Sequence, residues 1–218
     1  MSRILIKFPT RSRHSKSIEL INKYISFASH PEHIQIIVSV DSDDHPEKYI
    51  FTDPCITVKV GPPNGKINAI NRDIPDHSTF DILLVASDDM IPIVKGYDDI
   101  IRMKMYENFP DGDGVVWFND GFCKNNVNTL VICGSKYYQR FGYIYYPGYK
   151  SLWCDNEFTD VANRLKKQVY VDIVIIKHEH PANNSSVNND NLYEHNNSFN
   201  NIDKDLYIKR WNNEFRYR

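Results

Sequence analysis

The sequence of 218 residues contains no run close to the roughly 18 uncharged apolar residues that a membrane-spanning helix needs. This absence argues against a protein built on transmembrane helices. A secretion signal is also lacking, because the stretch that begins at Met1 meets Pro9 after a few mixed residues. We therefore expect a cytoplasmic protein.

Cysteine and excess charge are also scarce. The four cysteines are spread along the chain without a short repeated spacing, at Cys55, Cys123, Cys133 and Cys154. That distribution favours neither a disulfide framework nor a zinc ribbon, so we expect free thiols and a reducing compartment. The formal net charge is -2 and the isoelectric point is about 6.4, which argues against a surface that coats nucleic acid.

The sequence does contain a regular alternation of short apolar runs with amphipathic stretches. Buried strands are predicted at residues 4–8, 34–40, 56–60 and 82–85. Helical spacing of apolar residues predicts a helix over 15–27, and a second helix is predicted to start near Lys66. This rhythm is typical of an α/β protein with a mostly parallel sheet flanked by helices.

Beyond residue 96 the pattern weakens. Strands are still predicted at 115–118, 130–133 and 169–176, and a helix at 155–166. We expect a single catalytic-size domain over residues 1–181. Asparagine and serine then dominate, so residues 182–218 are predicted to form an Asn-rich extension that ends in a short helix packing on the domain or extending from it.

Polar side chains follow each of the first four predicted strands. They are Arg11 and Arg13 after the first, Asp41 after the second, Lys66 after the third, and Ser87, Asp88 and Asp89 after the fourth. Ligands of open α/β sheets bind outside the carboxyl ends of the strands, so these groups should meet at one rim. Carboxylates hold a hard divalent cation, and Arg or Lys takes the remaining phosphate charge. The pattern predicts a site for a metal-bound diphosphate, although an acidic pair alone could be a solvated loop.

Two further groups of ionisable residues lie late in the chain. Strand alternation would place His178 and His180 on one face at the end of the last strand, where they could bind a metal or be plain surface residues. Asp155 and Glu157 lie at a loop-to-helix boundary. One of them could cap the helix while the other projects into a cleft as a general base.

Taken in order, these motifs resemble the GT-A glycosyltransferases, especially the family-2-like inverting enzymes. The resemblance covers roughly residues 3–181. Pro9-Thr10-Arg11 looks like the family's opening strand-to-loop motif, and Asp41 like its nucleotide-contacting acid. The segment 64–71, which ends at Asn71, is similar to a Gly-Lys-x-x-Ala-x-Asn helix start. Ser87-Asp88-Asp89 occupies the place of the DXD metal motif, although the usual first aspartate is missing.

The resemblance implies a fold, a cofactor and residue roles. It implies Mn²⁺ or Mg²⁺ on Asp89, with Asp88 and a late histidine, His178 or His180, as further ligands. Asp155 would be the catalytic base, with Glu157 as the alternative. The donor, expected to be a UDP-sugar, would contact residues from the strand ends and the helix start, namely Pro9, Thr10, Arg11, Arg13, Asp41, Lys66, Asn71, Ser87 and Asp88.

The acceptor side is predicted from position alone. Trp117, Asn119 and Asp120 follow a predicted strand, and Tyr143 precedes the expected base, so these residues are candidates for the acceptor wall. The acceptor could be a hydroxyl of a glycan, a lipid-linked molecule, a protein or a nucleic acid. Two other functions remain open: a nucleotidyltransferase of related architecture, disfavoured by the lack of a Gly-rich basic loop after the first strand, and a non-catalytic carbohydrate-binding protein.

Overall fold

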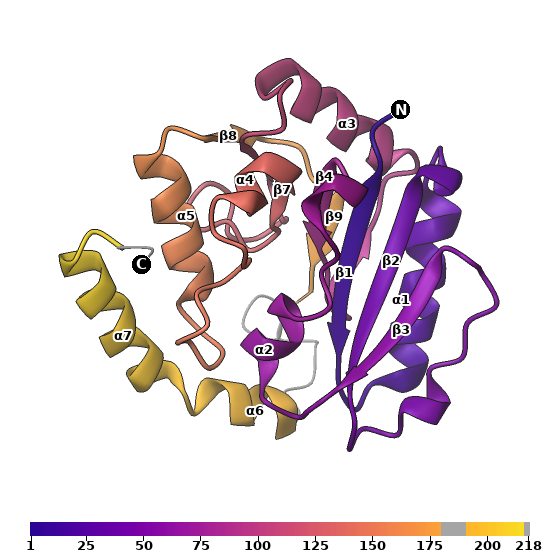
Figure 1. Cartoon of the computed structure of the whole chain (residues 1–218), viewed down its shortest axis with the longest axis horizontal. Coiled ribbons are helices and arrows are strands. Elements are labelled where there is room, and N and C mark those ends of the chain that lie inside the picture. Colours follow the sequence, from indigo (N-terminus) through magenta and orange to yellow (C-terminus); the bar gives the residue numbers. More distant parts are fainter. Residues whose placement is uncertain (180–190, 216–218) are drawn as a thin grey trace.

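A computed structural model describes residues 1–179 and 191–215. Its centre is a seven-stranded sheet with the order β3-β2-β1-β4-β7-β6-β8, and β5 pairs with β9 in a second small sheet (Figure 1). The strands are β1 Ile4–Thr10, β2 Ile34–Asp41, β3 Ile56–Gly61, β4 Ile82–Val85, β5 Met90–Pro92, β6 Val115–Phe118, β7 Ile132–Gly134, β8 Gln168–Val171 and β9 Ile176–His178. The α-helices are α1 His14–Phe27, α2 Lys66–Asn71, α3 Tyr97–Asn108, α4 Ser135–Gln139, α5 Cys154–Arg164, α6 Asn191–Asn197 and α7 Asn200–Asn212.

The first four strands form the parallel part of the sheet. β1 lies between β2 and β4 and is parallel to both, and β3 is parallel to β2. The continuous apolar runs of β1, β2 and β4 are buried because helices cover both faces, as in other parallel sheets, whereas the edge strand β3 is partly exposed. The prediction of a mostly parallel α/β sheet is confirmed.

The later strands depart from the parallel pattern. β7 is antiparallel to both β4 and β6, while β8 returns parallel to β6. The single strand predicted over 169–176 is instead two short strands that belong to different sheets. β8 completes the large sheet, whereas β9 is antiparallel to β5 and pairs His178 with Met90.

Side chains alternate between two apolar layers, one on each face of the sheet. In β1, Ile4 and Ile6 contact the layer that α1 and α3 cover, with Tyr24 and Tyr97 fully buried there. Leu5 points to the opposite layer, which α2, α4 and α5 cover. The period-2 alternation of β1 therefore joins two separate cores across a single strand.

The C-terminal helix α7 packs back on the domain. It runs along α5, with α6 below α2 (Figure 1). Arg210 forms a buried ion pair with Glu157 of α5, and Tyr207 donates a hydrogen bond to Asp160. None of the helices in the described part of the chain is long and apolar enough to cross a membrane.

Candidate active site

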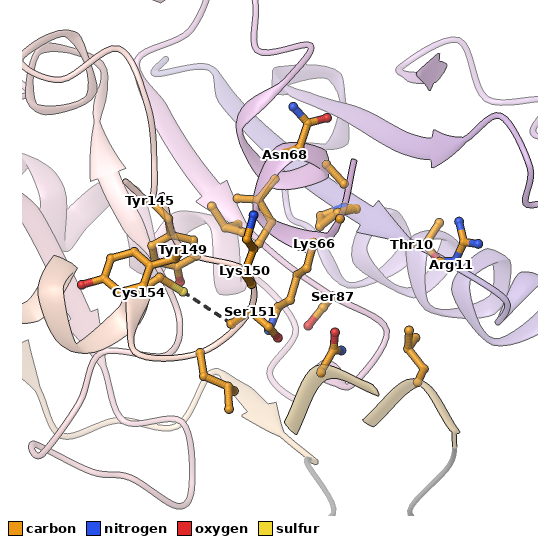
Figure 2. A pocket seen from close by; sticks show the side chains of 18 of the residues that line it. Thr10, Arg11, Lys66, Asn68, Ser87, Tyr145, Tyr149, Lys150, Ser151 and Cys154 are labelled. Atoms are coloured by element: carbon orange, nitrogen blue, oxygen red, sulfur yellow. Dashed lines mark hydrogen bonds between the residues drawn. The ribbon is translucent and has the colours of Figure 1, made fainter. Parts of the chain in front are cut away.

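A large cavity of about 1120 Å³ opens at the carboxyl ends of β1, β2 and β4. Its wall includes residues from α2, from the start of α5, from β9 and from α6. Twelve of the residues expected at the site line it: Pro9, Thr10, Arg11, Arg13, Asp41, Lys66, Asn71, Ser87, Asp88, Asp89, Asp155 and His178. In Figure 2, Thr10 and Arg11 lie at one end, Lys66, Ser87 and Ser151 in the middle, and Tyr145, Tyr149 and Cys154 at the other end.

One end of the cavity is dominated by paired charges at the ends of β1 and β2. Asp41 lies 2.9 Å from Arg11 and 3.0 Å from Arg72, so two guanidinium groups surround one buried carboxylate. Arg11 also donates two hydrogen bonds to Asp43. Side chains from two strands and α2 therefore create a polar end that offers both hydrogen-bond donors and acceptors to a nucleotide.

Asp88 is held by an arginine from the loop after β1. The Arg13 guanidinium lies 2.5 Å from the Asp88 carboxylate, and both side chains are largely buried. Burial raises the pKa of Asp88, and the charge of Arg13 partly opposes this effect. The position of Asp88 is consequently fixed by Arg13.

Asp89 and His178 meet because β5 pairs with β9. Asp89 Oδ2 lies 3.5 Å from His178 Nε2, and Ser87 donates a hydrogen bond to the other carboxylate oxygen. Burial opposes ionisation of Asp89, but hydrogen bonding and charge from His178, together with Ser87, hold its pKa well below the usual range. On its other side, His178 Nδ1 is 3.3 Å from the Thr129 hydroxyl, which donates to Asp120. Thr129 and Asp120 thus orient the imidazole.

The pair of Asp89 and His178 suits a divalent ion that also binds a diphosphate. An ionised carboxylate and an imidazole are ligands that Mn²⁺ accepts, and Mg²⁺ accepts the carboxylate. Within residues 1–179 and 191–215, no cluster of three or more His, Cys, Asp or Glu side chains forms a complete metal cage. Asp89 and His178 therefore offer an ion two protein ligands.

Asp155 occupies the first turn of α5 and lines the cavity. The residue before the helix, Trp153, has φ of 61°, a left-handed conformation that turns the chain sharply into α5. Burial raises the pKa of Asp155, and the positive charge of Lys66 counteracts it in part. A carboxylate with a raised pKa at a cavity has the property that a general base needs.

Glu157 does not reach the cavity, contrary to its place as the alternative base. Both of its oxygens accept hydrogen bonds from Arg210, at 2.6 and 2.7 Å, and Tyr149 donates a third at 2.8 Å. Helical residues two apart point in different directions, so Asp155 and Glu157 cannot face the same space. Glu157 is a structural partner of α7.

The predicted acceptor residues lie outside the cavity wall. Trp117 is buried in β6 and packs edge-on against Tyr170, and Asn119 is hydrogen-bonded to Asp172. Asp120 is buried behind His178, as described above. Tyr143 belongs to an aromatic group with Phe141 and Tyr146. The structure therefore does not bring these four residues to the cavity that holds the other expected site residues.

Asn71 and His180 are the remaining expected site residues. Asn71 does line the cavity, but its amide holds the neighbouring loop, accepting from the Ile144 and Tyr145 N–H groups and donating to the Tyr145 carbonyl. It therefore acts through the position of Tyr145. His180, the second histidine proposed as a metal ligand, lies outside the described residues.

Sequence reasoning missed one wall of the cavity. This wall comes from two segments. The loop before α5 contributes Pro147, Tyr149, Lys150, Ser151 and Leu152, and α6 with residues 198–199 contributes Leu192, His195, Asn196, Asn197 and Phe199. The second segment is rich in asparagine, and its composition shows no apolar period that would mark a buried face.

No protein-family model and no curated protein matches the chain. Among solved structures, it is similar to a mannosyltransferase from Pyrobaculum calidifontis in complex with GDP-Man and Mn²⁺, with a TM-score of 0.63 and 14% identity over 82% of this chain and 57% of that one. It is also similar to a mutant Drosophila β-1,4-galactosyltransferase 7 in complex with manganese, UDP-Gal and xylobiose. That match has a TM-score of 0.53 and 11% identity over 90% of this chain and 79% of that one.

These similarities establish the class of fold. The chain has the GT-A fold of nucleotide-sugar glycosyltransferases, as the motif order predicts. It spans little more than half the length of the mannosyltransferase.

Proposed function

We propose that the protein is a metal-dependent glycosyltransferase that moves a sugar from a nucleoside-diphosphate donor to an acceptor hydroxyl with inversion. The observation that supports this most directly is one cavity lined by Asp89, His178 and Asp155 together with the basic residues Arg13 and Lys66. Diphosphate binding and proton removal need these two sets of groups in a shared space. The GT-A neighbours bind GDP-Man or UDP-Gal, so a UDP-sugar is the first donor to test.

Asp89 and His178 would hold Mn²⁺ or Mg²⁺, with Asp88, the neighbour of Asp89 that pairs with Arg13, as a further ligand or a supporting residue. A divalent ion there supplies positive charge that stabilises the departing nucleoside diphosphate. Lys66 would add charge to the same phosphate groups, and Arg11 and Asp41 would contact the nucleoside. These roles follow from the ion pairs and from the positions of the residues on the cavity wall.

Asp155 would accept the proton of the acceptor hydroxyl. The acceptor oxygen then forms a bond to the anomeric carbon, while the bond from that carbon to the phosphate oxygen breaks and its electron pair leaves with the nucleoside diphosphate. Attack on the face opposite the leaving group inverts the anomeric centre. The raised pKa of Asp155 supports its role as base. The four free cysteines agree with a reducing, cytoplasmic compartment.

The test separates donor binding from turnover. Thermal shift with UDP-, GDP-, CDP- and dTDP-sugars, with and without Mn²⁺, identifies the donor, since a ligand that binds the native state raises its apparent stability. Asp89→Ala is expected to abolish the Mn²⁺-dependent shift and sugar release. Asp155→Asn should keep the shift and lose about 100-fold or more in transfer rate, the range typical of a missing general base.

Glu19→Gln, on the exposed side of α1, is the matched control and should behave like the parent protein. Parental transfer by both Asp89→Ala and Asp155→Asn would refute the assigned roles. Binding of a nucleotide sugar with no transfer or hydrolysis under any condition would instead favour a non-catalytic binding protein.

A further inference from the structure

One wall of the cavity differs in chemistry from the rest. The described residues that α6 and its following pair contribute are Leu192, His195, Asn196, Asn197 and Phe199, with no lysine, arginine or carboxylate among them. The rings of His195 and Phe199 pack edge to face with centroids 5.1 Å apart. This wall, which we call the α6 wall, thus presents amide groups beside an aromatic pair.

The α6 wall is tied to the loop that leads to the proposed base. Asn200, which follows Phe199, accepts a hydrogen bond of 3.0 Å from the indole of Trp153, two residues before Asp155. Fully buried Asp203 then accepts the backbone N–H groups of Lys150, Ser151 and Leu152 at 2.8–2.9 Å. These bonds fix the start of α7 against the loop that enters α5. Phe199, which directly precedes Asn200, is thereby tied to the chain segment that leads to Asp155.

The α6 wall differs in charge from the polar end of the cavity. Around Arg11, Arg13, Asp41 and Asp88 the cavity is lined by ionised groups that suit a nucleoside diphosphate. Lys150 is the basic residue that the loop before α5 contributes to the cavity, and Lys66 is contributed by α2. A phosphate or carboxylate on a ligand at the α6 wall would therefore meet no lysine or arginine from that wall, whose one ionisable side chain among the described lining residues is His195.

We propose that the α6 wall is the acceptor subsite and that the acceptor is a neutral carbohydrate. This inference rests on the proposed transferase function, because the acceptor hydroxyl must reach Asp155. Aromatic rings bind the apolar face of a sugar, and the amides of Asn196 and Asn197 donate to and accept from its hydroxyl groups. The asparagines of this segment thereby become recognition groups.

The test compares acceptors once a donor has been identified. Neutral methyl glycosides and disaccharides, sugar phosphates, acidic oligosaccharides and a Ser/Thr-rich peptide are offered to the parent protein with Mn²⁺ and donor. We expect transfer to neutral sugars. Phe199→Ala and Asn196→Ala should each raise the acceptor KM about three- to tenfold, as loss of a ring contact or a hydrogen bond does, with a far smaller change in the donor KM.

Glu194→Gln is the matched control, since Glu194 is exposed on the same helix and does not line the cavity. Its acceptor KM should equal that of the parent. Preference for phosphorylated, acidic or peptide acceptors would overturn the inference, as would an acceptor KM that Phe199→Ala and Asn196→Ala leave unchanged. In either of these outcomes the protein would still consume the donor. If it consumed no donor at all, the proposed function itself would be refuted.

Discussion

Arg11 and Arg210 both pair with carboxylates, but their surroundings are opposite. The Arg11 side chain is 38% exposed at the cavity and pairs with Asp41 and Asp43. The Arg210 side chain is 10% exposed, lies against the ring of Tyr146 and pairs with Glu157, itself 6% exposed. Solvent can replace a lost partner at Arg11 but not at Arg210. Charge at the cavity is therefore available for ligand binding, and charge behind α5 holds helices together.

The largest effect is expected from breaking the buried pair. Arg210→Met leaves the Glu157 carboxylate without its counter-charge and should lower the free energy of unfolding by about 3–5 kcal/mol. Urea unfolding at pH 7 measures this loss. The double variant Arg210→Met/Glu157→Gln removes both charges and should recover most of it.

Lys209→Met, at an exposed neighbouring position, is the control and should unfold like the parent. Equal unfolding midpoints for Arg210→Met and Lys209→Met would show that the pair does not hold α7 to α5.

An intermediate effect is expected at Lys7, a fully buried lysine in β1. Its ammonium donates to Ser39, whose hydroxyl donates to Asp73 at 2.7 Å. Burial lowers the pKa of Lys7 to about 7, and Asp73 opposes the effect in part. From about pH 7 up to the ordinary lysine value the unfolded chain binds more protons than the folded protein, so stability should rise with pH there.

Lys7→Met removes the titrating group. The parent should gain stability by up to about 1 kcal/mol per pH unit between pH 7.5 and 9.5, and the variant should lack this part of the slope. Urea unfolding midpoints of both proteins, measured across that pH range, test this prediction. Parallel slopes for the two proteins would mean that Lys7 keeps an ordinary pKa in the fold.

The smallest effect on stability is expected from Arg11→Met. An ion pair this exposed contributes less than about 1 kcal/mol to folding. Nucleotide binding should nevertheless weaken about tenfold, because a charged hydrogen bond to the ligand is lost. Titration calorimetry with the nucleoside diphosphate and Mn²⁺ measures the dissociation constant. Arg3→Met, an exposed arginine paired with Asp81 away from the cavity, should leave that constant unchanged; equal constants for all three proteins would exclude Arg11 from the site.

Much of the fold could be predicted because the parallel strands are continuous apolar runs. The strand predicted at 82–85 has the same bounds as β4, and 34–40 is one residue short of β2. Helix α3 escaped prediction because its apolar residues lie on two faces. Tyr97 and Ile101 are buried, whereas Met103 and Tyr106 are exposed, which blurs the period of a single face.

The gathering of Arg11, Asp41 and Ser87–Asp89 at one cavity could be predicted for a different reason. These residues directly follow strands, and the sheet itself brings strand ends together. The pairing of β5 with β9 brings His178 to Asp89. The sequence places His178 at the end of a strand but does not show which strand it pairs with. The position of the α6 wall depends on contacts between the start of α7 and residues 150–153, which are far apart in sequence. Neither the asparagines nor Phe199 carries a local signal for such contacts.

The position of α7 along the chain also affects how the protein is made. Every strand of the seven-stranded sheet precedes α7 in sequence. A ribosome therefore delivers the segments that form the sheet first, and they can pair while later residues are still being added. Asp203 emerges afterwards and finds the backbone of residues 150–152 already tethered to a folded body, so the cavity is finished from the sheet outward, with the flank beside Asp155 completed last.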